Sequence, residues 1–161
     1  MATRPEPFVP AEFAVPTEFA IDGLRLEPLG PQHNVADRDA WTSSIDHIRT
    51  TPGYQGSSWP TRVMSLDENL VDLERHASDF AARIGFTYTV LDRDGAVIGC
   101  VYIYPASRPG REAEVRSWVR ASHARLDPEL YAAVRDWLER DWPFRSVDYA
   151  VRPGADAPAA Q

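Results

Sequence analysis

The chain has 161 residues, of which 43% are hydrophobic and 25% charged, and this composition is typical of one globular domain with a sizeable core. Its net charge is −7, from 17 basic and 24 acidic residues, and no basic run is readable, which argues against a nucleic-acid partner. Cys100 is the single cysteine and sits in an apolar run, so no intramolecular disulfide is possible and a buried thiol is expected rather than a nucleophile.

Two further classes of protein are disfavoured by the residue pattern. The histidines and the cysteine do not have the spacing of a zinc site, so no metal is expected. The N-terminus lacks a charged-then-apolar signal, and no run approaches about 18 apolar residues. We therefore expect a cytoplasmic protein with no membrane partner.

Residues 1–21 are predicted to form an extended N-terminal arm. Proline fixes φ and removes a backbone donor, which disfavours a helix over a segment with four of them: Pro5, Pro7, Pro10 and Pro16. Phenylalanines between the prolines indicate that the arm docks on its own domain or on a second copy of the chain. A disordered arm is the alternative.

A single domain is predicted over residues 22–152, with a first strand over 22–29. A short amphipathic helix follows, with Asp37 as its capping residue and Pro52 at its end. The next segment, residues 52–64, is long for a loop in a compact domain, and loops of this length are often functional. Its aromatic residues either line a pocket or cover the core: Tyr54 and Trp59.

Ser65 and Glu68 form a capping box, which predicts that a helix begins here and runs to about Ile84, with Gly85 as its C-terminal glycine. His76 falls on or near the inner face of this helix, where a structural or solvent-facing role is more usual than a catalytic one. Two strands are then predicted over 86–92 and 96–104, joined at the Asp94-Gly95 turn.

Residues 112–142 contain a strand, a polar joint and a helix. Over the first ten residues of this segment, the side chains alternate between two faces, a period of two that is typical of a strand. Asp127 is predicted to cap the helix, with Pro128 in its first turn. A last strand over 147–151 completes a crossover, and such crossovers usually make their strands parallel. Residues 153–161 have nothing to bury and are predicted to be a disordered tail.

The fold class expected from this order is α/β (α+β). An antiparallel meander leads into a parallel strand–helix–strand crossover, which gives a mixed central sheet with helices on both faces. In open sheets of this kind, ligands tend to bind at the carboxyl end of a strand near a helix N-terminus.

Over roughly residues 22–152 the chain resembles the GNAT superfamily of N-acetyltransferases. DGLRLEPLGPQHN is similar to the family's first strand and turn, and FTYTVLDRDGAVIGCVYIYP to its second and third strands. EVRSWVRASHAR, followed by a helix, is similar to its fourth strand and cofactor helix.

The resemblance implies a cosubstrate, acetyl-CoA, and residues that bind it. Its pantetheine arm would lie along the fourth strand, near Trp118, Val119 and Arg120, and its pyrophosphate near Ser122, His123 and Arg125. The sequence departs from the family's loop at three positions. Pro128 and Leu130 stand where two small residues are usual, and Asp127 adds a negative charge. The three basic residues at 120, 123 and 125 would partly offset that charge.

Acetylation of an amine needs a base for the amine proton, and the leaving thiolate can take a proton from an acid. Glu114 is the first candidate base, with Glu112 and His123 as alternatives. Candidate acids are Tyr131 and Tyr149. The acceptor side would be lined by aromatic residues: Tyr54, Trp59, Tyr102 and Tyr104.

Two functions are therefore open. The first is an acetyl-CoA-dependent N-acetyltransferase that acts on an unknown small amine. The second is a non-catalytic member of the same fold that binds a ligand or associates with itself. The altered loop and the absence of the family's later elements favour this second reading. A homodimer through the arm or through the sheet edge is compatible with either.

Overall fold

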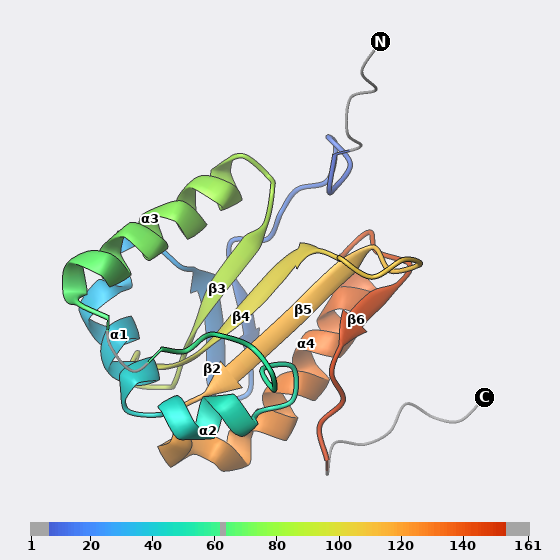
Figure 1. Cartoon of the computed structure of the whole chain (residues 1–161). Coiled ribbons are helices and arrows are strands. Elements are labelled where there is room, and N and C mark those ends of the chain that lie inside the picture. Colours follow the sequence, from blue (N-terminus) through green and yellow to red (C-terminus); the bar gives the residue numbers. More distant parts are fainter. Residues whose placement is uncertain (1–6, 62–63, 154–161) are drawn as a thin grey trace.

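The computed structural model describes residues 7–61 and 64–153 (Figure 1). In this part of the chain one six-stranded sheet runs in sequential order. Neighbouring strands are antiparallel from β1 to β5, and β6 lies parallel to β5. The predicted mixed sheet with a parallel crossover is confirmed. Its strands are β1 (Phe19–Ile21), β2 (Leu24–Pro28), β3 (Phe86–Leu91), β4 (Val97–Pro105), β5 (Ala113–Val119) and β6 (Val147–Tyr149).

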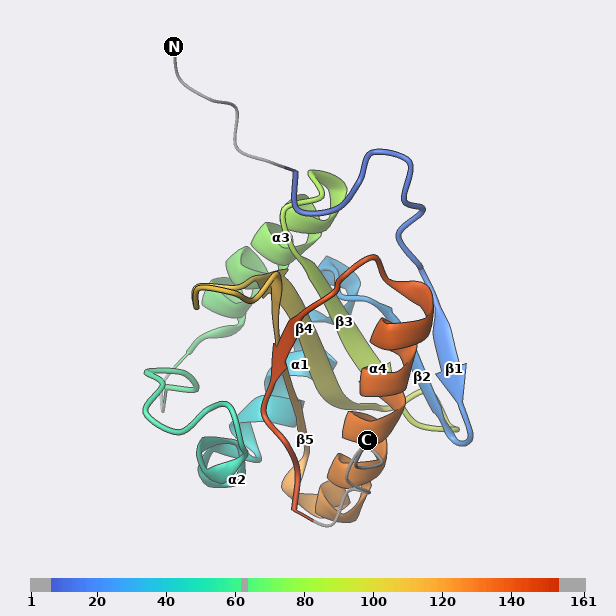
Figure 2. The ribbon, with the colours of Figure 1, turned by 90° about the vertical axis from the view of Figure 1, so that its right-hand side faces the viewer.

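Helices cover both faces of the sheet, as Figures 1 and 2 show. The helices α1, α2 and α3 lie on one side and α4 on the other. Each side has its own apolar core, built around Trp41 and Trp118 under α1 and around Trp137 and Trp142 under α4. The helices are η1 (Pro31–His33, 3₁₀), α1 (Asn34–Thr42), α2 (Ile45–Thr50), α3 (Leu66–Ala81), η2 (Ala121–Leu126, 3₁₀) and α4 (Asp127–Asp141).

The first strand is a hairpin of two strands rather than the single strand predicted over 22–29. β1 begins at Phe19, inside the predicted arm, and pairs with β2 across Gly23, whose φ is +82°. A three-residue strand with no polar alternation carries too weak a signal to be found by its period. The sheet therefore has one more antiparallel strand than the sequence predicts.

The helix predicted from Asp37 is in fact two helices, α1 and α2, separated at Ser43 and Ser44. Asp37 does not cap a helix, because α1 begins at Asn34 and Asp37 is a buried residue of its first turn. The capping prediction was therefore wrong at this position. At Ser65 it is confirmed: the serine hydroxyl accepts from the Glu68 amide, and the Glu68 carboxylate accepts from the Ser65 amide, both at 3.1 Å.

The end of α3 differs from the prediction as well. The helix ends at Ala81, before Ile84, and Arg83 takes the left-handed conformation expected of a glycine, with φ of +59°. Gly85 is instead buried against Tyr104. The packing is so close that a Cβ at this position would lie 2.2 Å from the tyrosine ring. The glycine thus allows a close contact rather than a helix cap.

Residues 7–18 of the arm pack on their own domain. The Phe8 ring stacks on Phe144 at 5.0 Å between centroids and on Phe86 at 5.8 Å. The Tyr88 hydroxyl donates to the Pro16 carbonyl oxygen at 2.6 Å. The first six residues of the predicted arm, and residues 154–161 of the predicted tail, lie outside the described residues.

Cys100 is fully buried in β4, as expected, and burial raises the pKa of its thiol well above the usual range. Within the described ranges, no helix is long and apolar enough to cross a membrane.

Candidate active site

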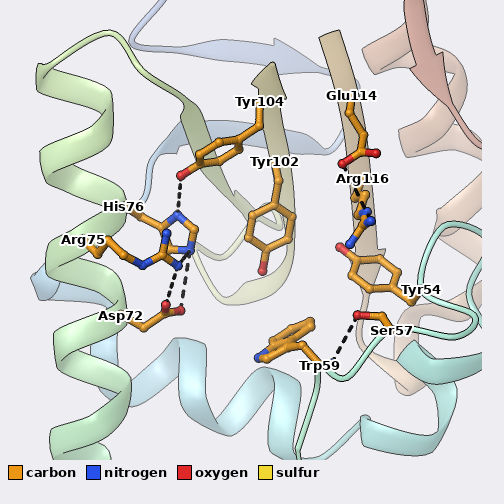
Figure 3. Close-up of a pocket in the computed structure, with 10 residues that line it drawn as sticks. All are labelled: Tyr54, Ser57, Trp59, Asp72, Arg75, His76, Tyr102, Tyr104, Glu114 and Arg116. Atoms are coloured by element: carbon orange, nitrogen blue, oxygen red, sulfur yellow. Dashed lines mark hydrogen bonds and ion pairs between the residues drawn. The ribbon is translucent and has the colours of Figure 1, made fainter. Parts of the chain in front are cut away.

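A pocket of about 460 Å³ opens between α3 and β5, on the face of the sheet that α1 and α2 also cover (Figure 3). Side chains at alternating positions of β4 and β5 form one wall. Tyr102 lies opposite Arg116 and Tyr104 opposite Glu114 in the strand register, so the four residues face the pocket in two rows. Glu114 and Arg116 form a loose ion pair at 3.7 Å, with 29% and 41% of their side chains exposed.

The opposite wall is one face of α3, where Asp72, Arg75 and His76 are brought together by helical spacing. Arg75 donates to the Asp72 carboxylate at 2.7 Å, and His76 Nε2 lies 3.5 Å from the same carboxylate. Burial acts to raise the pKa of Asp72, but the hydrogen bonds from His76 and Arg75 outweigh it and hold this pKa below its usual value. Asp72 is therefore a carboxylate that already has two partners.

The floor of the pocket is the loop after α2, where Tyr54 and Trp59 lie. Tyr54 is 3% exposed, and its hydroxyl has no hydrogen-bond partner among the described residues. Burial raises the pKa of this phenol well above its usual value, so the hydroxyl stays protonated and can donate. The guanidinium of Arg116 lies 5.9 Å from the centre of the Tyr54 ring. Trp59 contacts four aromatic rings: Trp41, Tyr54, Tyr102 and Trp118.

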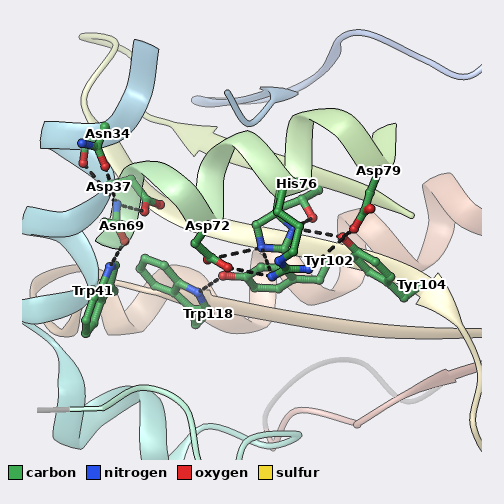
Figure 4. Close-up of polar contacts among 12 residues, drawn as sticks. Asn34, Asp37, Trp41, Asn69, Asp72, His76, Asp79, Tyr102, Tyr104 and Trp118 are labelled. Atoms are coloured by element: carbon green, nitrogen blue, oxygen red, sulfur yellow. Dashed lines mark hydrogen bonds and ion pairs between the residues drawn. The ribbon is translucent and has the colours of Figure 1, made fainter. Parts of the chain in front are cut away.

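His76 is held by a polar network behind the α3 wall (Figure 4). Its Nδ1 lies 2.9 Å from the Tyr104 hydroxyl and 3.0 Å from Thr87 Oγ1, and the Tyr104 hydroxyl donates to Asp79 at 2.9 Å. Both ring nitrogens of His76 therefore have partners, and the side chain is only 7% exposed. This arrangement fits the structural role expected for His76. It also fixes the position of Tyr104 in the pocket wall formed by β4 and β5.

A second polar cluster joins α1 to α3 deeper in the same layer (Figure 4). The indole of Trp41 donates to the Asn69 side-chain oxygen at 2.9 Å, and the Asn69 amide donates to the Asp37 carboxylate at 3.2 Å. Burial raises the pKa of Asp37 to about 6. The cluster fixes the two helices relative to each other without adding a group to the pocket.

The pairing of β5 with β6 is short. They pair from Ala113 to Val115, and beyond this point the side chain of Arg152 lies between β5 and the start of α4. Its Nη2 donates to the Ser117 carbonyl oxygen at 2.7 Å, and its Nε donates to Asp127 Oδ2 at 2.7 Å. Arg152 is 1% exposed and the Asp127 side chain 14%, so this ion pair is mostly but not fully buried.

Aromatic rings enclose the same guanidinium. It lies 5.7 Å from the centre of the Tyr131 ring and 5.6 Å from that of Tyr149, and the two rings are 4.7 Å apart. The Tyr149 hydroxyl is hydrogen-bonded to Ser117 Oγ, and burial raises its pKa above the usual range. A cation between two tyrosine faces and a carboxylate satisfies the requirements for a buried arginine.

The three residues predicted along a pantetheine arm have other contacts in the structure. Trp118 is buried under α1 and its indole donates to the Tyr102 hydroxyl at 3.1 Å, while Val119 is buried in the core under α4. The Arg120 guanidinium lies 3.0 Å from the Asp39 carboxylate. What these residues could offer to a ligand between β5 and β6 is therefore backbone rather than side chain.

The residues predicted near a pyrophosphate lie on η2. Ser122 and Arg125 are exposed and His123 is half-buried. Ser122 Oγ lies 2.9 Å from His123 Nδ1, whereas Arg125 makes no hydrogen bond or ion pair to another described residue. Arg125 thus remains available to an anion at this helix end.

Asp127 does not cap α4, contrary to the prediction. The 3₁₀ helix η2 runs directly into α4, so Asp127 already has helical φ and ψ, and its carboxylate bonds Arg152 instead. The amides of His123 and Asp127 donate to the carbonyl oxygens of Arg120 and Ala124. Two amides near this helix end are therefore already occupied.

The structure does not bring the three predicted catalytic residues together. Glu114 faces the pocket, whereas Tyr131 and Tyr149 lie on the α4 face of the sheet. The register explains the separation, because Tyr149 pairs with Val115, the neighbour of Glu114, and successive side chains point to opposite faces. The four predicted aromatic residues, in contrast, all line the pocket: Tyr54, Trp59, Tyr102 and Tyr104.

Among the residues of the pocket, sequence reasoning did not predict Asp72, Arg75 or Arg116, and it also missed Arg152. Asp72, Arg75 and His76 have the i, i+3, i+4 spacing of one helix face, and Arg116 follows Glu114 by two, so both patterns were readable. Arg152 lies beyond the last strand and carried no local signal. In the described part of the chain, no cluster of three or more acidic, histidine or cysteine side chains could hold a metal ion.

No family sequence model matches the chain, and no curated protein sequence matches it significantly. Solved structures match it in fold. The ribosomal-protein-S5-alanine acetyltransferase of Vibrio fischeri superimposes with a TM-score of 0.57 at 15% identity, over 75% of this chain and 66% of that one. RimJ of Mycobacterium smegmatis, in complex with CoA-disulfide, gives 0.61 at 16% identity, over 81% and 63%.

This chain has the GNAT acetyltransferase fold. The microcin C7 self-immunity acetyltransferase MccE, in complex with acetyl-CoA and AMP, shares the GNAT fold too, with a TM-score of 0.54 at 13% identity over 74% of this chain and 62% of that one. The chain spans roughly two thirds of the length of these GNAT structures.

Proposed function

We propose that this chain is an acetyl-CoA-dependent acetyltransferase that acetylates a small amine bound in the pocket between α3 and β5. The observation that carries the proposal is the position of Glu114. Its carboxylate faces the pocket from β5, one residue before the point at which the pairing of β5 with β6 ends. Direct transfer requires that the thioester pass between β5 and β6, where their pairing ends, and come within about 3–3.5 Å of the amine beside Glu114.

In the proposed reaction, acetyl-CoA supplies the acetyl group as a thioester. Glu114 takes the proton that the attacking amine loses as the C–N bond forms. Tyr149, or Tyr131 beside it, gives a proton to the sulfur as the C–S bond breaks. Burial raises the pKa of Tyr149, which keeps the hydroxyl protonated at neutral pH but makes it a weaker acid. The proposed role therefore requires that this pKa fall toward that of the departing thiol when acetyl-CoA binds.

The fit of the cosubstrate between β5 and β6 depends on Arg152. The Ser117 carbonyl is the backbone acceptor that a pantetheine amide would use, and Arg152 already donates to it. The proposal therefore requires that this guanidinium leave its position when acetyl-CoA binds. Arg125, exposed on η2, is the residue proposed to meet the pyrophosphate.

Calorimetric titration with acetyl-CoA tests the proposal. Arg152→Met is expected to bind at least tenfold more tightly than the wild type, because the internal competitor is gone, and Arg125→Ala is expected to bind more weakly. Arg140→Met, on the solvent face of α4, is the matched control and should not differ from the wild type. Release of free thiol with a panel of amines then tests transfer. Absence of binding in both the wild type and Arg152→Met at millimolar acetyl-CoA would overturn the proposal.

A further inference from the structure

The β5 wall of the pocket presents one group of each charge, and we infer that the pocket binds a zwitterion, an α-amino acid with a large apolar or aromatic side chain. The inference deepens the proposed function and rests on it in one respect: the α-amino group is taken to be the acceptor nitrogen. Binding itself does not depend on acetyl transfer and can be tested separately.

Two donors, one on the floor of the pocket and one on the β5 wall, form the proposed site for a carboxylate. Tyr54 carries a buried hydroxyl with no partner among the described residues, although such groups are nearly always hydrogen-bonded in proteins. The guanidinium of Arg116 lies beside the same ring, 5.9 Å from its centre. A carboxylate bound at Arg116 would form a charge-assisted hydrogen bond with the arginine. The Tyr54 hydroxyl is closed to solvent in the structure, so the carboxylate would reach it only if the Arg116 side chain moved off the ring.

Glu114 supplies the site for the ammonium group. It lies two residues before Arg116 on the same face of β5, so the two side chains start about 6–7 Å apart along the strand. Their own ion pair is loose, at 3.7 Å, which leaves both groups open to a ligand. In an α-amino acid the ammonium and the carboxylate are carried by one carbon. Glu114 and Arg116, which are neighbours on one face of β5, match this arrangement.

The other ion pair of the pocket is closed. Asp72 is held by Arg75 at 2.7 Å and by His76, which in turn is fixed by Tyr104 and Thr87. These partners leave little capacity for a new charge. The α3 wall therefore shapes the pocket, whereas the β5 wall recognises the charged end of the ligand.

The rest of the pocket suits an apolar side chain. Trp59 on the floor and Tyr102 on the β4 wall form an aromatic corner, with their ring centres 6.4 Å apart. A volume of about 460 Å³ falls within the usual range for small-molecule sites. A purely cationic amine would meet two arginines on the walls, and a purely anionic ligand would meet Glu114 and Asp72, so each is disfavoured relative to a zwitterion.

The experiment is calorimetric titration of the full chain, without acetyl-CoA, with three matched probes. L-tryptophan carries both charges, tryptamine lacks the carboxylate, and indole-3-propionate lacks the amine. L-tryptophan is expected to bind at least tenfold more tightly than either analogue. L-phenylalanine, L-leucine and L-methionine complete the panel, so that the class does not depend on the indole ring.

Three variants separate the roles of the residues. Tyr54→Phe and Arg116→Met are expected to abolish the preference for L-tryptophan over tryptamine, and Glu114→Gln the preference over indole-3-propionate. Arg108→Met, outside the pocket, is the control and should retain both. Tyr54→Phe should also melt no lower than the wild type, because it removes an unpaired buried hydroxyl, which separates a binding role from a folding role.

Equal affinity for tryptamine and L-tryptophan in the wild type would overturn the inference, as would failure of every amino acid in the panel to bind at 10 mM. Binding of L-tryptophan without any acetyl transfer would retain the zwitterion site and refute the proposed function instead. The two failures are thus distinguishable.

Discussion

Arg152 donates a 2.7 Å hydrogen bond to the carbonyl oxygen of Ser117 and thereby joins the segment after β6 to the middle of β5. The same guanidinium donates to the Asp127 carboxylate at the start of α4. One side chain therefore connects three segments that are far apart in the sequence. It also occupies the place in which the proposed cosubstrate would lie.

The Arg152–Asp127 pair should be strongly coupled in stability. Arg152→Met leaves the mostly buried Asp127 carboxylate without its partner and is expected to cost up to about 3–5 kcal/mol. The double variant Arg152→Met/Asp127→Asn should cost clearly less than the sum of the two single changes. Urea denaturation of the four proteins measures the coupling. Additive costs would show that the buried pair is not coupled, and Arg140→Met should stay within about 0.5 kcal/mol of the wild type.

Stability should depend on the ionisation of Asp37. Burial raises the pKa of this carboxyl from 3.8 to about 6, so the folded state binds its proton more tightly than the unfolded chain does. The resulting stabilisation is fully present below pH 3.8 and is lost as the pH rises through about 6. At roughly 1.4 kcal/mol per pH unit, the loss amounts to about 3 kcal/mol.

Asp37→Asn cannot ionise and should therefore be more stable than the wild type at pH 7.5, by as much as about 2 kcal/mol, with little or no advantage at pH 4.5. Urea midpoints at the two pH values measure this difference. Asp136→Asn, an exposed residue of α4, controls for the general effect of removing a negative charge. A difference between Asp37→Asn and the wild type that does not change with pH would contradict the prediction.

Gly99 should not tolerate a side chain. A Cβ at this position would lie 2.3 Å from the Trp118 carbonyl oxygen on β5, and backbone cannot move aside as a side chain can. Gly99→Ala is expected to destabilise the protein by about 1–3 kcal/mol or more and Gly99→Val by more still. A thermal melt of both variants tests the order, and an alanine variant that melts with the wild type would contradict the close approach of the two strands.

The N-terminal arm should stabilise its own domain. Phe8→Ala removes a ring that stacks on Phe86 and Phe144, and we expect a cost of about 1–3 kcal/mol because the side chain is only partly buried. The melting temperature should fall while the molar mass measured by light scattering stays the same. A change in mass would instead indicate that the arm docks on a second copy.

The elements predicted correctly from the sequence were those whose signal comes from residues close together in the chain. The capping box at Ser65, the Asp94-Gly95 hairpin and the alternation over 112–121 each depend on residues a few positions apart, and the structure has all three features. The mixed sheet followed from their order. The aromatic residues of the pocket were found for a similar reason, since Tyr102 and Tyr104 share one face of a strand.

What sequence reasoning could not find depends on contacts between distant segments. Asp127 is a good capping residue by type, yet Arg152, after the next strand, takes its carboxylate. Asp37 likewise looks like a cap, but Asn69 on α3 is its partner. In both cases a residue with a strong local preference is used by a tertiary contact that no window of neighbouring residues contains.

The stacking of Phe8 on Phe144 also bears on how the chain is made. The arm leaves the ribosome before its partners on β3 and after α4 have been synthesised. Its phenylalanines therefore remain exposed to water until almost the entire domain has emerged. Docking of the arm is therefore among the last contacts that the domain can form as it is synthesised.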